Sequence, residues 1–154
     1  MSDWNRQTKE VPLEGLPSEI ANAIHQHIEQ YGLGPILSDT RMCVQTVSEK
    51  AKKGLFGRAE TVKMTAIVTP RWLVWSLEQP NATAIVISAQ LIHVTIQDYA
   101  QTTFVDLIPD SGIQVTGMFT DASESASAFI GLDEGEAGKR FKDLVIKNAR
   151  DARK

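Results

Sequence analysis

The stretch Thr61-Val62-Lys63-Met64-Thr65-Ala66-Ile67-Val68-Thr69 alternates between apolar and polar side chains. Its even-numbered positions are all apolar and share one face of an extended chain, while the odd-numbered positions are mostly threonine or lysine and point to the other face. A period of two predicts a β-strand with one face buried and one face toward water. The fold class therefore depends on what this strand pairs with.

Six further segments carry strand signals, either alternation or β-branched runs between turn residues. They are residues 42–49, 72–77, 83–87, 92–97, 113–119 and 126–132. Turn sequences separate them at short spacing, among them Thr69-Pro70-Arg71, Gln79-Pro80-Asn81 and Pro109-Asp110-Ser111-Gly112. With the first strand this predicts seven strands, in the manner of a sandwich or barrel. The pattern of residues 102–107 is ambiguous.

Two helices are expected to flank the strands. From Pro17, apolar residues recur at three- and four-residue spacing until Gly32-Leu33-Gly34-Pro35 ends the pattern, which predicts an amphipathic helix. Before it, residues 1–16 lack clear periodicity and are expected to form an arm that is either poorly ordered or draped over the surface. Near the C-terminus, Asp133 and Glu136 resemble the capping box of a second helix. Its apolar stripe consists of Ala137, Phe141, Leu144, Val145, Ala149 and Ala152.

Composition argues against several classes of protein. A net charge of -3 disfavours a nucleic-acid coat, because neutralising phosphates requires a basic excess. The first six residues lack the basic start and apolar stretch of a secretory signal. The most apolar stretch, residues 82–96, is interrupted by polar side chains, so no transmembrane segment is expected. The single cysteine, Cys43, cannot form an internal disulfide, which fits a reducing, cytoplasmic location.

The order of these elements, together with four short motifs, resembles bacterial members of the pleckstrin-homology-like (PH-like) superfamily. The motifs are Gly54-Leu55-Phe56-Gly57, the stretch Val68-Thr69-Pro70-Arg71-Trp72-Leu73-Val74-Trp75, Ser111-Gly112-Ile113 and Phe129-Ile130-Gly131-Leu132. The resemblance covers residues 36–152. The stretch Arg58-Ala59-Glu60 departs from the basic pattern of phosphoinositide-binding members, so the resemblance is to the bacterial branch.

The resemblance implies a fold that is mainly β with helices, α+β by count. It is a partly open barrel of seven antiparallel strands closed by a C-terminal α-helix, here with an extra N-terminal helix. Residues 1–35 are then the arm and amphipathic helix packed on the domain, and residues 36–154 are the PH-like domain. Domains of this superfamily mostly bind lipids, peptides or their own copies.

Patterns that indicate catalysis or metal binding are weak. His25 and His27 lie two positions apart on a helix, where side chains diverge by roughly 200° and cannot share a metal ion. His93 is expected on the solvent side of its strand, and Cys43, without a nearby acid or base, is expected as a small core residue. We therefore predict no catalytic residue, no metal site and no cofactor.

The segment from residue 50 to residue 58 is the strongest candidate for a binding site. Its basic residues are Lys50, Lys52, Lys53 and Arg58, and its apolar residues are Leu55 and Phe56. Positive charge around apolar side chains suits the surface of an anionic membrane. The competing interpretation is a solvated turn whose apolar side chains fold back on the barrel.

The sequence thus predicts a non-enzymatic binding or assembly module whose ligand is unassigned. The expected partner is a protein, a peptide or another copy of the chain, because the strand edges of a partly open barrel accept extended segments. The alternative is weak peripheral binding to anionic membrane lipids through Lys50 to Arg58. An unrecognised enzyme is the third interpretation.

Overall fold

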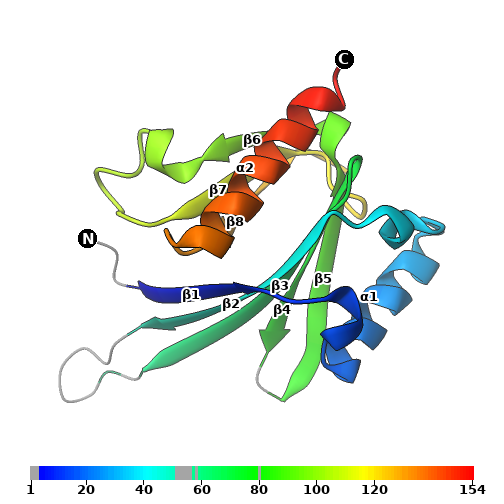
Figure 1. Ribbon diagram of the computed structural model, residues 1–154, viewed down its shortest axis with the longest axis horizontal. Coiled ribbons are helices and arrows are strands. Elements are labelled where there is room, and N and C mark those ends of the chain that lie inside the picture. Colours follow the sequence, from blue (N-terminus) through cyan, green and yellow to red (C-terminus); the bar gives the residue numbers. More distant parts are fainter. Residues whose placement is uncertain (1–3, 51–56, 58, 80) are drawn as a thin grey trace.

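In the residues that the structure describes, eight strands form two antiparallel sheets (Figure 1). The structure is a computed structural model that describes residues 4–50, 57, 59–79 and 81–154. The first sheet has the order β1 (Trp4–Glu10), β2 (Met42–Lys50), β3 (Glu60–Val68), β4 (Trp72–Gln79) and β5 (Ala82–Gln90). The second sheet has the order β6 (Val94–Asp98), β7 (Gly112–Gly117) and β8 (Ala126–Gly131).

In the described ranges, two α-helices cover these sheets (Figure 1). Helix α1 (Ser18–Gln30) lies beside β5 on the outside of the first sheet, and helix α2 (Glu136–Asp151) contacts strands of both sheets. The described short 3₁₀ helices are η1 (Leu13–Gly15), η2 (Ile36–Asp39), η3 (Leu91–His93) and η4 (Tyr99–Gln101). No helix in the described ranges is long and apolar enough to cross a bilayer.

The even-numbered face of β3 points into the main core, as its alternation predicts. Ala66 and Val68 belong to the apolar cluster between the sheets, and Met64 packs against it. Phe141 and Val145 of α2 are fully buried in the same cluster, which confirms that the C-terminal helix docks by its apolar stripe. Burying each of these two side chains contributes about 1.5–3 kcal/mol by transfer arithmetic.

The opposite face of the first sheet is also buried where α1 covers it. Ile20 and Ile24 of this helix pack against Cys43, Ile67 and Val74 in a second apolar cluster. The amphipathic N-terminal helix and the core position of the cysteine are both confirmed. This cover also explains why an isoleucine interrupts the polar positions of β3, since its side chain faces a helix and not water.

The surface arm predicted for residues 1–16 is wrong for β1, which pairs with β2 along its whole length. Arg6 and Thr8 face inward, so this strand lacks the apolar alternation by which the other strands are recognised. Hydrogen bonds hold it instead: Arg6 Nη1 donates to Ser48 Oγ at 2.5 Å, and the hydroxyls of Thr8 and Thr46 lie 2.9 Å apart. The described chain therefore has eight strands, one more than predicted.

The capping box predicted at the start of α2 is also wrong. The residue before the helix is Gly135, which has no side chain with which to cap the first turn. The Asp133 carboxylate instead accepts the backbone N–H of Thr8 at 2.7 Å and that of Gly135 at 3.0 Å. This carboxylate therefore ties the beginning of the helix to β1.

The chain between β5 and β7 departs furthest from the predicted strand pattern. The 3₁₀ turn η3 replaces the beginning of the predicted strand 92–97, and β6 starts only at Val94. The segment 102–107, which carried no clear pattern, forms a succession of turns after η4. These turns project at one end of the molecule, on the left of Figure 1.

Candidate functional site

The basic segment predicted as a lipid-binding loop lies almost entirely outside the described residues. Lys50 ends β2, and its ammonium nitrogen lies 5.6 Å from the centre of the Trp4 ring, in the geometry of a cation–π contact. The other candidates lie outside the described ranges: Lys52, Lys53, Leu55, Phe56 and Arg58. Lipid binding by this segment stays a prediction.

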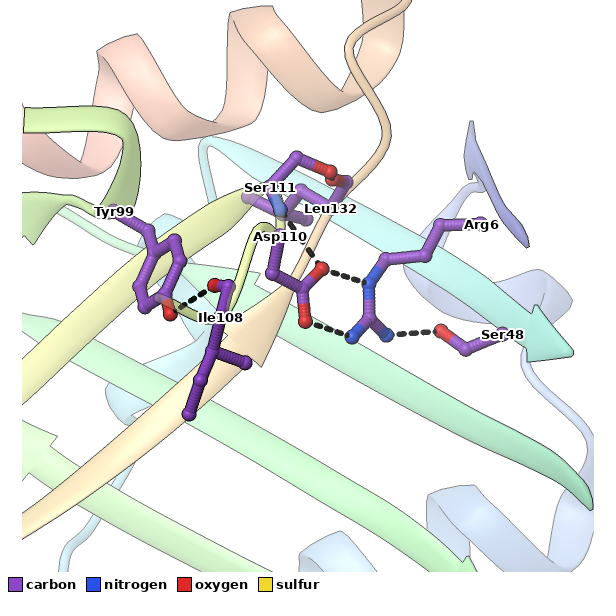
Figure 2. Close-up of polar contacts among 7 residues, drawn as sticks. All are labelled: Arg6, Ser48, Tyr99, Ile108, Asp110, Ser111 and Leu132. Carbon is purple, nitrogen blue, oxygen red and sulfur yellow. Dashed lines mark hydrogen bonds and ion pairs between the residues drawn. The ribbon is translucent and has the colours of Figure 1, made fainter. Parts of the chain in front are cut away.

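A different loop gathers the features of a binding surface. We call residues 99–111, between β6 and β7, the apolar loop. An ion pair holds its C-terminal end: Arg6 Nε and Nη2 donate to the two carboxylate oxygens of Asp110 at 2.9 and 2.7 Å (Figure 2). Both side chains are only 11% exposed. A two-bonded pair of this kind fixes orientation as well as distance.

Further hydrogen bonds fix the apolar loop around this ion pair. The Tyr99 hydroxyl donates to the backbone carbonyl of Ile108 at 2.6 Å, which joins the two ends of the loop (Figure 2). Beside it, Ser111 Oγ donates to the backbone carbonyl of Leu132 at 2.5 Å. Within the loop, the Ile108 N–H donates to the Phe104 carbonyl at 2.8 Å. The two ends of the loop are thus joined to each other, and its base is fixed to β1 and to Leu132, directly after β8.

The side chains held at the tip are apolar and face water. Leu107 is 82% exposed, Ile108 67% and Phe104 51%. Single exposed apolar residues are ordinary on protein surfaces, but three within five positions form a patch, and such patches indicate interaction sites. We call these three residues the loop tip.

A second apolar surface lies at the other end of the molecule. A depression of about 490 Å³ is lined chiefly by Leu33, Trp72, Met118 and Phe119, and we call it the apolar groove. Its floor is fixed, because the Phe119 ring packs edge-on against buried Trp75 with 5.5 Å between the ring centres. In Figure 1 the segment between β7 and β8 that supplies Met118 lies on the right, opposite the apolar loop.

Carboxylates also gather near the base of the apolar loop, but hydrogen bonds account for them. Arg6, Asp110 and Asp133 line a depression of about 420 Å³. Asp110 bonds the guanidinium of Arg6, and Asp133 accepts two backbone N–H groups. These contacts give both carboxylates a structural role. In the described part of the chain, no group of three or more His, Cys, Asp and Glu side chains is arranged to hold a metal ion.

The histidines lie in three different settings. His27 is buried, and its Nε2 lies 2.8 Å from the hydroxyl of Ser88, which in turn lies 2.6 Å from that of Thr120. Burial lowers the pKa of His27, and the charge of Asp121 opposes this shift. His25 is exposed on α1. His93 is exposed, as expected, but it lies in η3 and not on a strand, and it borders the apolar groove.

Sequence reasoning missed the apolar loop because its residues carry no period. The available signal was composition: the segment before Pro109 carries Phe104, Leu107 and Ile108 without forming the stripe of a helix or the alternation of a strand. Apolar residues that share no face of a helix or strand cannot pack together against a core as a stripe does. Several apolar residues without such a pattern therefore indicate an exposed apolar segment.

Comparison of the chain with protein-family models, curated proteins and solved structures finds no match.

Proposed function

We propose that the chain is a non-enzymatic, cytoplasmic assembly module of the PH-like kind, whose copies associate head to tail. The loop tip of one copy enters the apolar groove of the next. The observation that carries the proposal is the 82% exposure of Leu107 on a loop whose base is fixed by hydrogen bonds. The strand order supports the PH-like part, because β2 to β5, then β6 to β8, then α2 follow the expected sequence of elements.

The fixed base favours binding because the loop is already ordered before a partner arrives. Ordering a free loop at an interface consumes part of the interaction free energy, and a preorganised loop avoids that cost. The anchors of Asp110 to Arg6 and of Ile108 to Tyr99 also oppose inward folding of the tip. Contact with another molecule would therefore remove Leu107 and Ile108 from water without disturbing these anchors.

The apolar groove supplies a surface of matching chemistry on the same chain. Because the loop and the groove lie at opposite ends of the molecule, the loop cannot reach its own groove (Figure 1). A patch that fits a pocket elsewhere on the same surface produces a heterologous contact, which repeats into a ring or an open filament.

Charge supports the same pairing. Asp106 is exposed within the apolar loop, and Arg71 is exposed directly before Trp72 of the apolar groove. Head-to-tail contact therefore brings opposite charges together at the rim of the interface. A loop seated in a groove buries less area than the roughly 800 Å² per partner of a standard interface, so we expect association that depends on concentration.

Sedimentation velocity over a wide concentration range tests the proposal. We expect the weight-average mass of the wild-type protein to rise with concentration and that of Leu107→Asp to stay at the monomer value. Ile85→Asp is the matched control, because Ile85 is an exposed apolar residue of β5 outside both surfaces. A wild-type protein that is monomeric at every concentration contradicts the proposal, as does an unchanged mass for Leu107→Asp.

A further inference from the structure

A second groove runs between helix α1 and the free edge of β5. Its larger part, of about 660 Å³, is lined by residues of α1 and of the β4–β5 hairpin, among them Glu19, Gln26, Glu78 and Thr83. A smaller part, of about 200 Å³, continues along the same helix to Tyr31. The two parts share Gln26 and Thr83, so they form one continuous depression, which we call the edge groove. Figure 1 shows α1 and β5 side by side.

The strand along this groove has unpaired backbone groups. Strand β5 is the last of its sheet, with β4 on one side only. The Ser88 carbonyl accepts the Thr120 N–H at 2.9 Å, so it points away from β4. In an antiparallel ladder every second residue points the same way, so Val86, which lies opposite Ser76 in regular register, also directs its N–H and C=O groups to the free edge. Outside the ladder with β4, no described residue forms a backbone hydrogen bond with Val86.

The side chains that line the edge groove favour a basic ligand. The larger part carries the carboxylates of Glu19 and Glu78, and none of the residues described as lining it is lysine, arginine or histidine. Its other polar groups are mainly the side-chain amides of Asn22, Gln26, Gln79 and Asn81. Carboxylates attract cationic side chains, and amides bond to either group of a peptide backbone.

We propose that the edge groove binds an extended segment of a protein partner that is rich in lysine or arginine, added as a further strand to β5. Main-chain hydrogen bonds to Val86 hold the segment, and its cationic side chains lie over Glu19 and Glu78. A second copy of this chain does not fit in the same way, because an edge-to-edge dimer brings the two acidic grooves together. This site is separate from the loop tip and the apolar groove, so it does not rest on the assembly proposal.

Fluorescence anisotropy with a labelled six-residue peptide of alternating lysine and valine tests this inference. We expect saturable binding, and at least about tenfold weaker binding of the matched glutamate–valine peptide. A third peptide keeps the lysines but carries N-methyl groups on alternate backbone amides, so it lacks the donors that strand pairing requires. We expect this peptide also to bind at least about tenfold more weakly.

Protein variants locate the binding site. The double variant Glu19→Gln/Glu78→Gln removes both carboxylates of the edge groove and should weaken binding of the lysine peptide about five- to tenfold, with less dependence on salt. Glu134→Gln, which removes an exposed carboxylate far from this groove, should bind like the wild type. Absence of lysine-peptide binding overturns the inference. Equal binding of the N-methylated peptide, or an unchanged affinity in the double variant, overturns it as well.

Discussion

The guanidinium of Arg6 and the carboxylate of Asp110 form a two-bonded ion pair between residues 104 positions apart in the chain. Arg6 lies on β1, the strand that carries no apolar pattern, and Asp110 lies near the C-terminal end of the apolar loop. The Arg6 guanidinium also lies 5.5 Å from the centre of the Phe129 ring on β8. A single side chain thus connects the edge of the first sheet, the edge of the second sheet and the candidate binding loop.

Replacing one member of this pair should destabilise the protein substantially. Arg6→Gln leaves the Asp110 carboxylate largely buried without its cation, and we expect a loss of about 2–4 kcal/mol in the free energy of unfolding. Urea denaturation measures it. The control is Glu10→Gln, which breaks the exposed ion pair between Glu10 and Arg140 and should cost less than about 1 kcal/mol. Equal effects of the two variants would show that the buried pair is not a main anchor.

Gly112 at the start of β7 should resist substitution much more than Gly32 after α1. Both have positive φ, but a Cβ on Gly112 would lie 2.1 Å from the Ile130 carbonyl oxygen, whereas nothing lies within 4 Å of a Cβ on Gly32. Gly32→Ala should therefore cost only about 1–2 kcal/mol of backbone strain. For Gly112→Ala we expect about 3 kcal/mol or more, because the paired strand must also move. Thermal and urea unfolding of the two variants compares these costs.

Stability should fall on mild acidification because of His27. Its pKa in the folded protein lies below the ordinary value of 6.5, chiefly because the ring is buried. The unfolded chain therefore binds more protons below pH 6.5 than the folded chain does. The free energy of unfolding drops from that pH downward and levels off once the folded-state pKa is passed.

The variant His27→Gln should remove this pH-dependent component, and His25→Gln, at an exposed position of the same helix, serves as the control. Unfolding curves of the three proteins between pH 7.5 and 5, in steps of about half a unit, measure the difference. Parallel stability profiles for the wild type and His27→Gln would refute the assignment.

The lipid hypothesis makes its own prediction. Basic residues near an anionic leaflet contribute about 1 kcal/mol each to the free energy of membrane binding. If this segment binds lipid, the protein should therefore pellet with phosphatidylserine-rich vesicles at low salt. Replacing Lys50, Lys52, Lys53 and Arg58 with glutamine should then abolish pelleting, while neutral phosphatidylcholine vesicles should pellet neither protein. Equal pelleting of the wild type and the variant eliminates this segment as a lipid site.

The sequence predicts the elements whose residues face an apolar core. Strand β3, helix α1 and helix α2 each present a stripe or an alternating face, and each packs as its pattern indicates. Burial of apolar side chains is the main force that stabilises these three elements. The spacing of their apolar residues is visible in the sequence, so the sequence predicts them.

The sequence does not predict the features held by long-range polar contacts. Strand β1 depends on Arg6 and Thr8, whose partners Asp110 and Asp133 lie more than a hundred positions away. The periodicity of neighbouring residues does not reveal polar contacts between residues that are far apart in the chain. In the sequence the carboxylate of Asp133 therefore resembles a helix cap, and residues 102–107 are ambiguous, because groups that fix these features lie far away in the chain.

Site-directed disulfide crosslinking tests head-to-tail assembly most directly. Leu107→Cys places a thiol on the loop tip, and Met118→Cys places one in the apolar groove. The native Cys43 should not interfere, because it is buried and its thiol pKa is raised to about 12. Under mild oxidation, we expect a mixture of the two variants to form a covalent heterodimer much faster than either variant forms a homodimer. Absence of the heterodimer, or homodimers of Leu107→Cys forming as fast, would contradict the proposed contact.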